Sequence, residues 1–177
     1  SDHALELTPR NIATTMVSCS RLNYKNETVL RAILGAIPAV AREFNAQAIA
    51  NILNARAKLK YKDNAVVRCL LLEVPQKARQ FDSQNIANTL HAMAKFDYQD
   101  DIVMQCLLQE VRPKANNFNA QAISNTLYAM AKLRKEDDAV MQCLLYEAER
   151  KVRSFNSQNI ANNIRINFLS IVLFEII

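Results

Sequence analysis

Apolar residues recur along this chain in two alternating patterns, and each has the spacing of an amphipathic helix. In the first pattern, Ile49 and Leu53 lie four residues apart, and the pair recurs as Ile86 and Leu90. The second pattern begins at Ala65 and runs AVVRCLLLEV, with apolar residues three and four apart. Positions with these spacings share one side of a helix. The patterns predict alternating helices and an all-α protein, which fits the single glycine in 177 residues.

The two patterns together repeat every 37 residues. FNAQAIANIL begins at Phe44 and returns as FDSQNIANTL at Phe81, FNAQAISNTL at Phe118 and FNSQNIANNI at Phe155, and Leu7 opens a degenerate version. This period predicts a right-handed α-solenoid of antiparallel helix pairs. The expected division is a leader or cloning remnant (1–6), one repeat domain (7–162) with units 7–43, 44–80, 81–117, 118–154 and a partial 155–162, and an aberrant tail (163–177).

Helix starts are predicted by residues that cap helix N-termini. Pro9 falls at a first helical position. The expected caps are Thr8, Asn45, Asp82, Asn119 and Asn156 for the first helices of the units, and Asn26, Asp63, Asp100 and Asp137 for the second helices.

The tail departs from the repeat after residue 162 and continues as NIRINFLSIVLFEII. It is apolar but too short to span a membrane. Three interpretations remain open: a capping helix, a patch for self-association, and a change of reading frame. The abrupt loss of register favours the third.

Four cysteines are present, and three of them, Cys69, Cys106 and Cys143, occupy equivalent positions, whereas Cys19 does not. Equivalent sites of stacked helix pairs lie roughly 10 Å apart, too far for a disulfide. We therefore expect small buried residues of an intracellular protein.

Polar residues form a stripe along the predicted first helices, at positions 4, 8, 11 and 15 of the unit. The stripe comprises Arg10, Thr14, Val17 and Arg21; Gln47, Asn51, Asn54 and Lys58; Gln84, Asn88, His91 and Lys95; Gln121, Asn125, Tyr128 and Lys132; and Gln158, Asn162 and Arg165. Regularly spaced cations can neutralise phosphates. Amides can bond base edges, and His91 or Tyr128 can stack on a base. The stripe predicts a groove for single-stranded RNA.

A structural interpretation competes with this one. Asn51, Asn88 and Asn125 can form an amide ladder that bonds loops of the neighbouring unit. The stripe lysines lie near helix C-termini, where cations are favourable in any case. A second basic set, Lys77, Lys114 and Lys151, follows Glu73, Glu110 and Glu147 by four residues. It predicts local ion pairs on a solvated outer face.

The sequence gives no sign of catalysis. His91 has no metal ligand at suitable spacing, and His3 lies in the leading segment. We find no nucleophile motif or phosphate-binding loop, so we expect no enzyme, metal or cofactor. The net charge of +5 and the pI of about 9.1 are compatible with an anionic partner.

The repeated F-N-x-Q-x-I-[AS]-N-T-L-x-A-M-A-K-[LF] pattern resembles the heptatricopeptide and octotricopeptide repeats. It also resembles a 37-residue repeat of undefined function from intracellular bacterial pathogens. The resemblance covers nearly all of residues 7–162. It implies organellar RNA binding for eukaryotic relatives, and a secreted effector or scaffold for bacterial ones. Relatives commonly have tryptophan at Asn54, His91 and Tyr128, and glycine at Lys60, Asp97 and Arg134.

The leading hypothesis is a non-catalytic module that binds single-stranded RNA. Its candidate site residues are Lys58, Lys95, Lys132, Arg21, Gln84, His91, Gln121, Tyr128 and Asn54. The alternative is a protein-interaction scaffold, such as part of a bacterial effector, that grips its partner in the same groove. The corresponding locations are an organelle such as the mitochondrion, or the host cytosol.

Overall fold

The computed structural model describes residues 8–61 and 64–156, and these are helical, as predicted. The first helices of the successive units are α1 (Pro9–Arg21), α4 (Ala46–Leu59), α7 (Ser83–Phe96) and α10 (Ala120–Lys132). The second helices are α2 (Glu27–Gly35), α5 (Asn64–Leu71), α8 (Asp101–Gln109) and α11 (Asp138–Arg150). Short helices follow as α3 (Ile37–Val40), α6 (Val74–Lys77) and α9 (Val111–Lys114), with 3-10 turns η1 (Ala41–Glu43), η2 (Ala78–Gln80), η3 (Ala115–Asn117) and η4 (Val152–Ser154).

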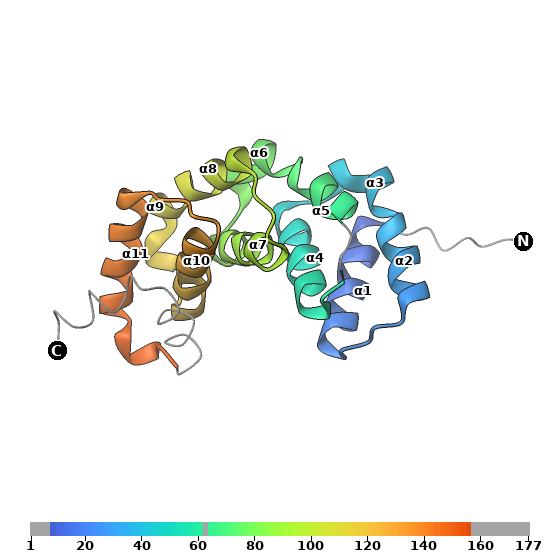
Figure 1. Cartoon of the computed structure of the whole chain (residues 1–177), viewed down its shortest axis with the longest axis horizontal. Coiled ribbons are helices and arrows are strands. Elements are labelled where there is room, and N and C mark those ends of the chain that lie inside the picture. Colours follow the sequence, from blue (N-terminus) through green and yellow to red (C-terminus); the bar gives the residue numbers. More distant parts are fainter. Residues whose placement is uncertain (1–7, 62–63, 157–177) are drawn as a thin grey trace, which may run out of the picture.

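The first helices pack side by side in chain order and make the most extensive contacts among the described helices. α1 packs on α4, α4 on α7, and α7 on α10. A second layer is linked by contacts of α3 with α5, α6 with α8, and α9 with α11. Together the two layers form an arch, with the first helices on its inner side and α5, α6 and α8 along its outer side (Figure 1).

The core between the layers uses the same positions of successive units. Phe44, Phe81 and Phe118 open these units and are at most 1% exposed. Each ends a 3-10 turn and accompanies an N-cap residue that directs the chain into the next first helix. Burying an aromatic ring contributes a few kcal/mol, so each phenylalanine fixes a unit to the core.

Most predicted N-caps are confirmed. Thr8, Asn45, Asp82 and Asn119 accept hydrogen bonds from backbone amides three residues later, as do Asn26, Asp100 and Asp137 in the second helices. Pro9 lies in the first turn of α1. The predicted cap at Asp63 and the tail 163–177, with its proposed self-association, lie outside the described residues.

The ends of the first helices contain a left-handed residue. Lys60, Asp97 and Arg134 have φ angles of 57°, 55° and 53°, and Asn23 has 50°. This region costs an L-residue roughly 1–2 kcal/mol, which is why glycine is favoured at such C-terminal positions. The glycine of the resembling repeats therefore has a conformational reason, and this chain meets the same backbone requirement with larger residues.

The expectation of a solvated outer face for Lys77, Lys114 and Lys151 is wrong. Their local ion pairs with glutamates exist, at 3.1, 2.7 and 2.8 Å. However, the three lysine side chains are only 16%, 23% and 27% exposed. Each ammonium turns inward and donates to backbone carbonyls of the preceding connection.

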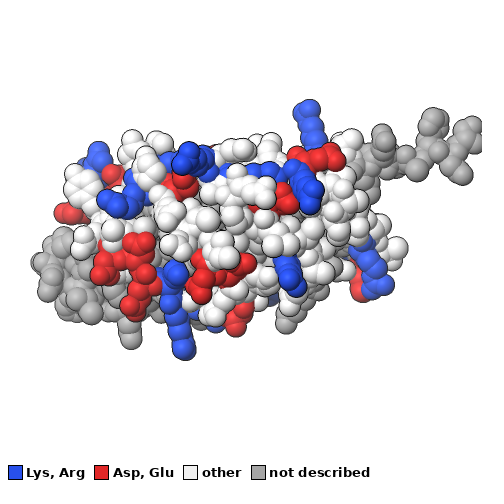
Figure 2. Space-filling model, turned by 90° about the horizontal axis from the view of Figure 1, so that it is seen from above, with Lys and Arg blue, Asp and Glu red and all other residues white. Residues whose placement is uncertain are grey.

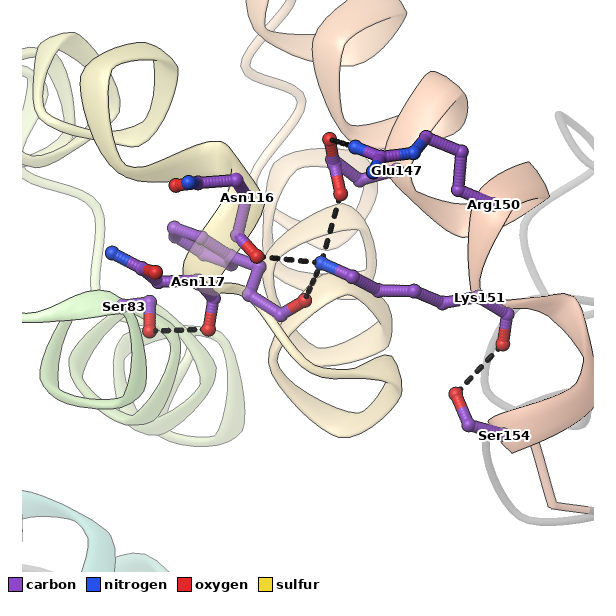
Figure 3. A network of polar contacts seen from close by, with 8 residues as sticks. Ser83, Asn116, Asn117, Glu147, Arg150, Lys151 and Ser154 are labelled. Carbon is purple, nitrogen blue, oxygen red and sulfur yellow. Dashed lines mark hydrogen bonds and ion pairs between the residues drawn. The ribbon is translucent and has the colours of Figure 1, made fainter.

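Figure 3 shows this arrangement at Lys151. Its Nζ atom donates to the carbonyl oxygens of Asn116 and Phe118, each at 2.8 Å, and pairs with Glu147. Arg150 pairs with the same carboxylate at 2.9 Å. The hydrogen bond from Lys151 lowers the pKa of Glu147, with the charges of Lys151 and Arg150 adding to the effect and burial opposing it. The lysine thus joins α11 to the connection before α10.

The cysteines are free, as expected. Cys19 is buried, but Cys69, Cys106 and Cys143 are only half-buried, so the prediction of buried residues is wrong for these three. They lie on the second helices, with part of each side chain facing solvent. Burial raises the pKa of Cys69, and the charge of Glu73 adds to this. Among the described residues no helix is long and apolar enough to cross a membrane.

Candidate nucleic-acid interface

Four cations lie near the C-terminal ends of the first helices. Arg21 is the last residue of α1, and Lys58, Lys95 and Lys132 are in the last turns of α4, α7 and α10. All four side chains are exposed. Because these helices pack side by side, the cations form a line across the row, which we call the cation line. Neighbouring helix axes lie roughly 8–10 Å apart.

Two aromatic residues of the predicted stripe meet between α7 and α10. The rings of His91 and Tyr128 have their centroids 5.4 Å apart and are tilted by 42°. The Nζ atom of Lys95 lies 5.2 Å from the centre of the Tyr128 ring. Both aromatic residues are half-buried, so each ring packs between the helices while part of it faces solvent.

His91 lies close enough to two members of the cation line for their charges to affect its pKa. Burial lowers the pKa of His91 to about 4, and the charges of Lys95 and Lys58 add to the effect. The imidazole is therefore neutral at neutral pH. Its Nδ1 atom is buried without a hydrogen-bond partner in the described part of the chain. The structure thus brings together side chains from α4, α7 and α10 that the sequence separates by 37 residues.

On α7 and α10, two pairs of stripe amides form hydrogen bonds within their own helix. Gln84 donates from Nε2 to Oδ1 of Asn88 at 3.0 Å, and Gln121 donates to Asn125 at 2.8 Å. Asn125 is buried, whereas Asn88 is half-buried. These bonds run along a helix and not to a loop of the neighbouring unit, so each glutamine side chain is oriented along its own helix. Asn54, the remaining stripe candidate, is half-buried on α4.

The ion pair that Lys132 of the cation line forms is long and exposed to solvent. Lys132 lies 3.6 Å from Asp97, and the two side chains are 48% and 73% exposed. An exposed pair of this kind contributes between zero and about 1 kcal/mol, so an anionic ligand can replace the aspartate. Lys60 and Arg134, which sequence reasoning did not select, are exposed two residues after Lys58 and Lys132. They add positive charge to the same edge. Both occupy the same position of the 37-residue unit, and this shared position could have identified them from the sequence.

A hollow of about 540 Å³ lies between α1 and α4. Much of its lining comes from stripe positions: Arg10, Thr14, Val17 and Arg21 of α1, and Gln47 and Asn51 of α4. Ala13 and Ala48 complete an apolar floor, and Glu43 is the one acidic residue in the lining. The polar stripe of the first unit therefore borders a concave surface.

Arg56 is a charged residue that the sequence analysis missed. It occupies the place of Met93 and Met130 in the repeat and is completely buried. Its guanidinium lies 5.0 Å from the centre of the Phe96 ring and donates to the carbonyl oxygen of Tyr61 at 3.1 Å. These contacts assign Arg56 to packing between α4 and α7 and not to the exposed face.

The outer face carries charges of both signs. Seen from above, this face carries Lys and Arg side chains interspersed with Asp and Glu, and no single sign covers it (Figure 2). This face therefore offers a charged partner no continuous surface of one sign.

The fold and this face define an all-α protein of packed helix pairs with a basic edge along the row of first helices. The sequence model of the family described as RNA-editing substrate-binding complex 6 protein matches residues 4–138. The chain belongs to this family. A second model, of a protein family of unknown function, matches residues 142–163. No curated protein matches the chain.

Proposed function

We propose that this protein is a non-catalytic module that binds single-stranded RNA along the row of first helices. The observation that carries the proposal is the cation line, Arg21, Lys58, Lys95 and Lys132, which presents one exposed cation per helix. The module is a right-handed α-solenoid of 37-residue units within residues 7–162. Each unit supplies the same phosphate contact.

Electrostatics favours a strand that crosses the row. A step of roughly 8–10 Å between helices places successive cations at a spacing that a flexible nucleic-acid backbone can follow. Repeat proteins that read RNA contact about one base per helical repeat. The line therefore neutralises several phosphates of one strand, and binding releases their counterions.

The other stripe residues favour a single strand over a duplex. Gln84 and Gln121 lie in the first turns of α7 and α10, on the same stripe as the cations of the last turns. There they can bond base edges. The partly exposed rings of His91 and Tyr128 offer surfaces on which an unpaired base can stack. Base edges and faces are accessible in a single strand but not in an A-form helix, whose major groove is deep and narrow.

The family match supports RNA as the ligand, because the family's description names RNA-editing substrate binding. The same description names a complex, which supports the second candidate function, a scaffold that holds a protein partner in the same groove. Neither family description refers to an effector or to an organelle. A role as an effector and a location in an organelle therefore stay hypotheses that rest on the resemblance of the repeats.

The proposal is tested by fluorescence anisotropy with a labelled 12-nucleotide single-stranded RNA and a duplex of the same composition, at 50 and 200 mM salt. We expect tighter binding of the single strand. The slope of log affinity against log salt should be about −2 to −3, since each phosphate contact to a single strand contributes about −0.7. Absence of binding, or a slope near zero, would exclude this function and direct attention to a protein partner.

A further inference from the structure

The hollow between α1 and α4 lies at the end of the row formed by the first two first helices. On α7, the positions equivalent to Thr14 and Val17 of α1 are occupied by the larger Asn88 and His91. His91 contacts the ring of Tyr128 on α10. The smaller Thr14 and Val17 of α1 line the hollow of about 540 Å³.

This volume is within the range of small-ligand sites, roughly 300–1,000 Å³. The lining suits a flat heteroaromatic ring with polar edges. Ala13, Val17 and Ala48 supply an apolar floor, while Gln47 and Asn51 supply amide donors and acceptors. Asparagine and glutamine side chains form paired hydrogen bonds with base edges.

Charge defines how a nucleotide would lie in the hollow. Arg21 borders it at the end of α1 that belongs to the cation line, and Arg10 borders it at the opposite end. The two positions are eleven residues apart, which corresponds to about 16 Å along a helix. A phosphate at Arg21 therefore places the attached base over the middle of the hollow, next to Thr14 and Asn51.

We propose that the hollow between α1 and α4 receives one nucleobase of the bound strand, edge-on to Gln47 and Asn51, with its phosphate at Arg21. This inference rests on the proposed function and adds a base-binding subsite to it. Bases at the α7–α10 end stack on partly exposed rings, whereas the base at the α1–α4 end enters a concave site. Guanidinium groups bond guanine edges, so Arg10 is placed to contact a purine that reaches the far end.

The test compares two labelled 12-mers: oligouridylate RNA, and a ribose-phosphate chain of the same length without bases. The Ala48→Leu variant fills the hollow with an aliphatic side chain that cannot stack like an aromatic ring. Thr15→Leu, at an exposed residue of α1 that does not line the hollow, is the matched control. Thr14→Leu fills the hollow from α1, so a folding defect in one variant leaves the other informative. Circular dichroism checks the fold of each.

We expect Ala48→Leu and Thr14→Leu to weaken oligouridylate binding about 5- to 10-fold, the order of one lost base contact. Binding of the chain without bases should stay within about 2-fold, because the cation line is intact. Thr15→Leu should bind both probes as the wild type does. An equal effect on both probes, or no effect on either while the wild type binds RNA, would overturn the subsite and leave the proposed function standing. Failure of the wild type to bind either probe would overturn the function itself.

Discussion

The ammonium of Lys114 lies 2.8 Å from the carbonyl oxygen of Phe81, thirty-three residues earlier in the chain. It also donates to the carbonyl of Arg79 at 3.0 Å and pairs with Glu110 at 2.7 Å. The same arrangement recurs at Lys151 with Phe118. One side chain therefore satisfies backbone acceptors at the junction between two units and also neutralises a half-buried carboxylate.

Lys114→Met should consequently destabilise the fold by about 2–4 kcal/mol, because it leaves backbone acceptors and Glu110 without their donor. The matched control is Lys58→Met, an exposed lysine whose loss should cost less than about 0.5 kcal/mol. Urea unfolding followed by circular dichroism measures both. Equal stabilities of the two variants would show that the inward lysines do not hold the junctions.

Leucines at one repeat position provide a second test, since Leu22 is 79% exposed whereas Leu59 and Leu133 are 4% and 6% exposed. Leu59→Ala should cost about 2–4 kcal/mol through lost burial and a residual cavity. Leu22→Ala should change the free energy of unfolding by less than about 0.5 kcal/mol. If both substitutions cost the same, the first unit is packed differently from the structure described.

Replacing a left-handed residue by glycine should stabilise the protein. Arg134 has a φ of 53°, and its backbone N–H donates a hydrogen bond to the carbonyl oxygen of Ala131 at 3.2 Å. Arg134→Gly should raise the free energy of unfolding by about 0.5–1 kcal/mol, the net of relieved strain and greater unfolded-state entropy. Ala131→Gly, within the exposed surface of α10, should lower it by about 1 kcal/mol. A thermal melt that ranks the two variants in the opposite order would contradict the geometry.

Stability should fall on acidification through the titration of His91. Its pKa is lowered to about 4 from 6.5 by burial and then by Lys95 and Lys58, so the unfolded chain binds more protons between these values. The contribution is complete above pH 6.5 and is lost as pH falls toward 4. Between pH 7 and 5 the loss should be about 1 kcal/mol after allowance for solvent screening.

His91→Asn introduces the residue that Asn54 provides at the same position of the preceding unit. It should make the free energy of unfolding depend less on pH. Glu147 does not interfere, because its pKa is lowered below its usual 4.5 and its stabilisation is lost only at lower pH. Urea unfolding at pH 7, 6 and 5 makes the comparison. A wild-type protein whose stability is constant over this range would show that the imidazole is more exposed than described.

Local patterns in the sequence were sufficient to predict the helices and most caps, because an N-cap side chain bonds an amide only three residues away. The burial of Arg56 was not predictable in this way, since it depends on Phe96 of the neighbouring helix. Likewise, the i,i+4 pairing of Lys114 with Glu110 was visible, but its bond to Phe81 required the stacking of units. For the candidate site, the stripe was found from spacing. The hollow was missed. Its signal in the sequence was that Val17 is smaller than His91, which occupies the same position of a later unit.

The central claim is that the cation line binds RNA, and matched charge reversals test it most directly. One variant combines Lys58→Glu, Lys95→Glu and Lys132→Glu. The other combines Arg68→Glu, Arg79→Glu and Arg112→Glu, which are exposed and belong to α5, η2 and α9, not to the first helices. The two variants have the same net charge, so they differ only in where the cations are lost.

The measurement is anisotropy of the labelled 12-nucleotide RNA at 100 mM salt. The account predicts that reversal of the cation line weakens binding at least about 100-fold, while the outer reversal weakens it less than about 5-fold. Equal loss in the two variants would mean that overall charge and not this face attracts RNA, and would contradict the account.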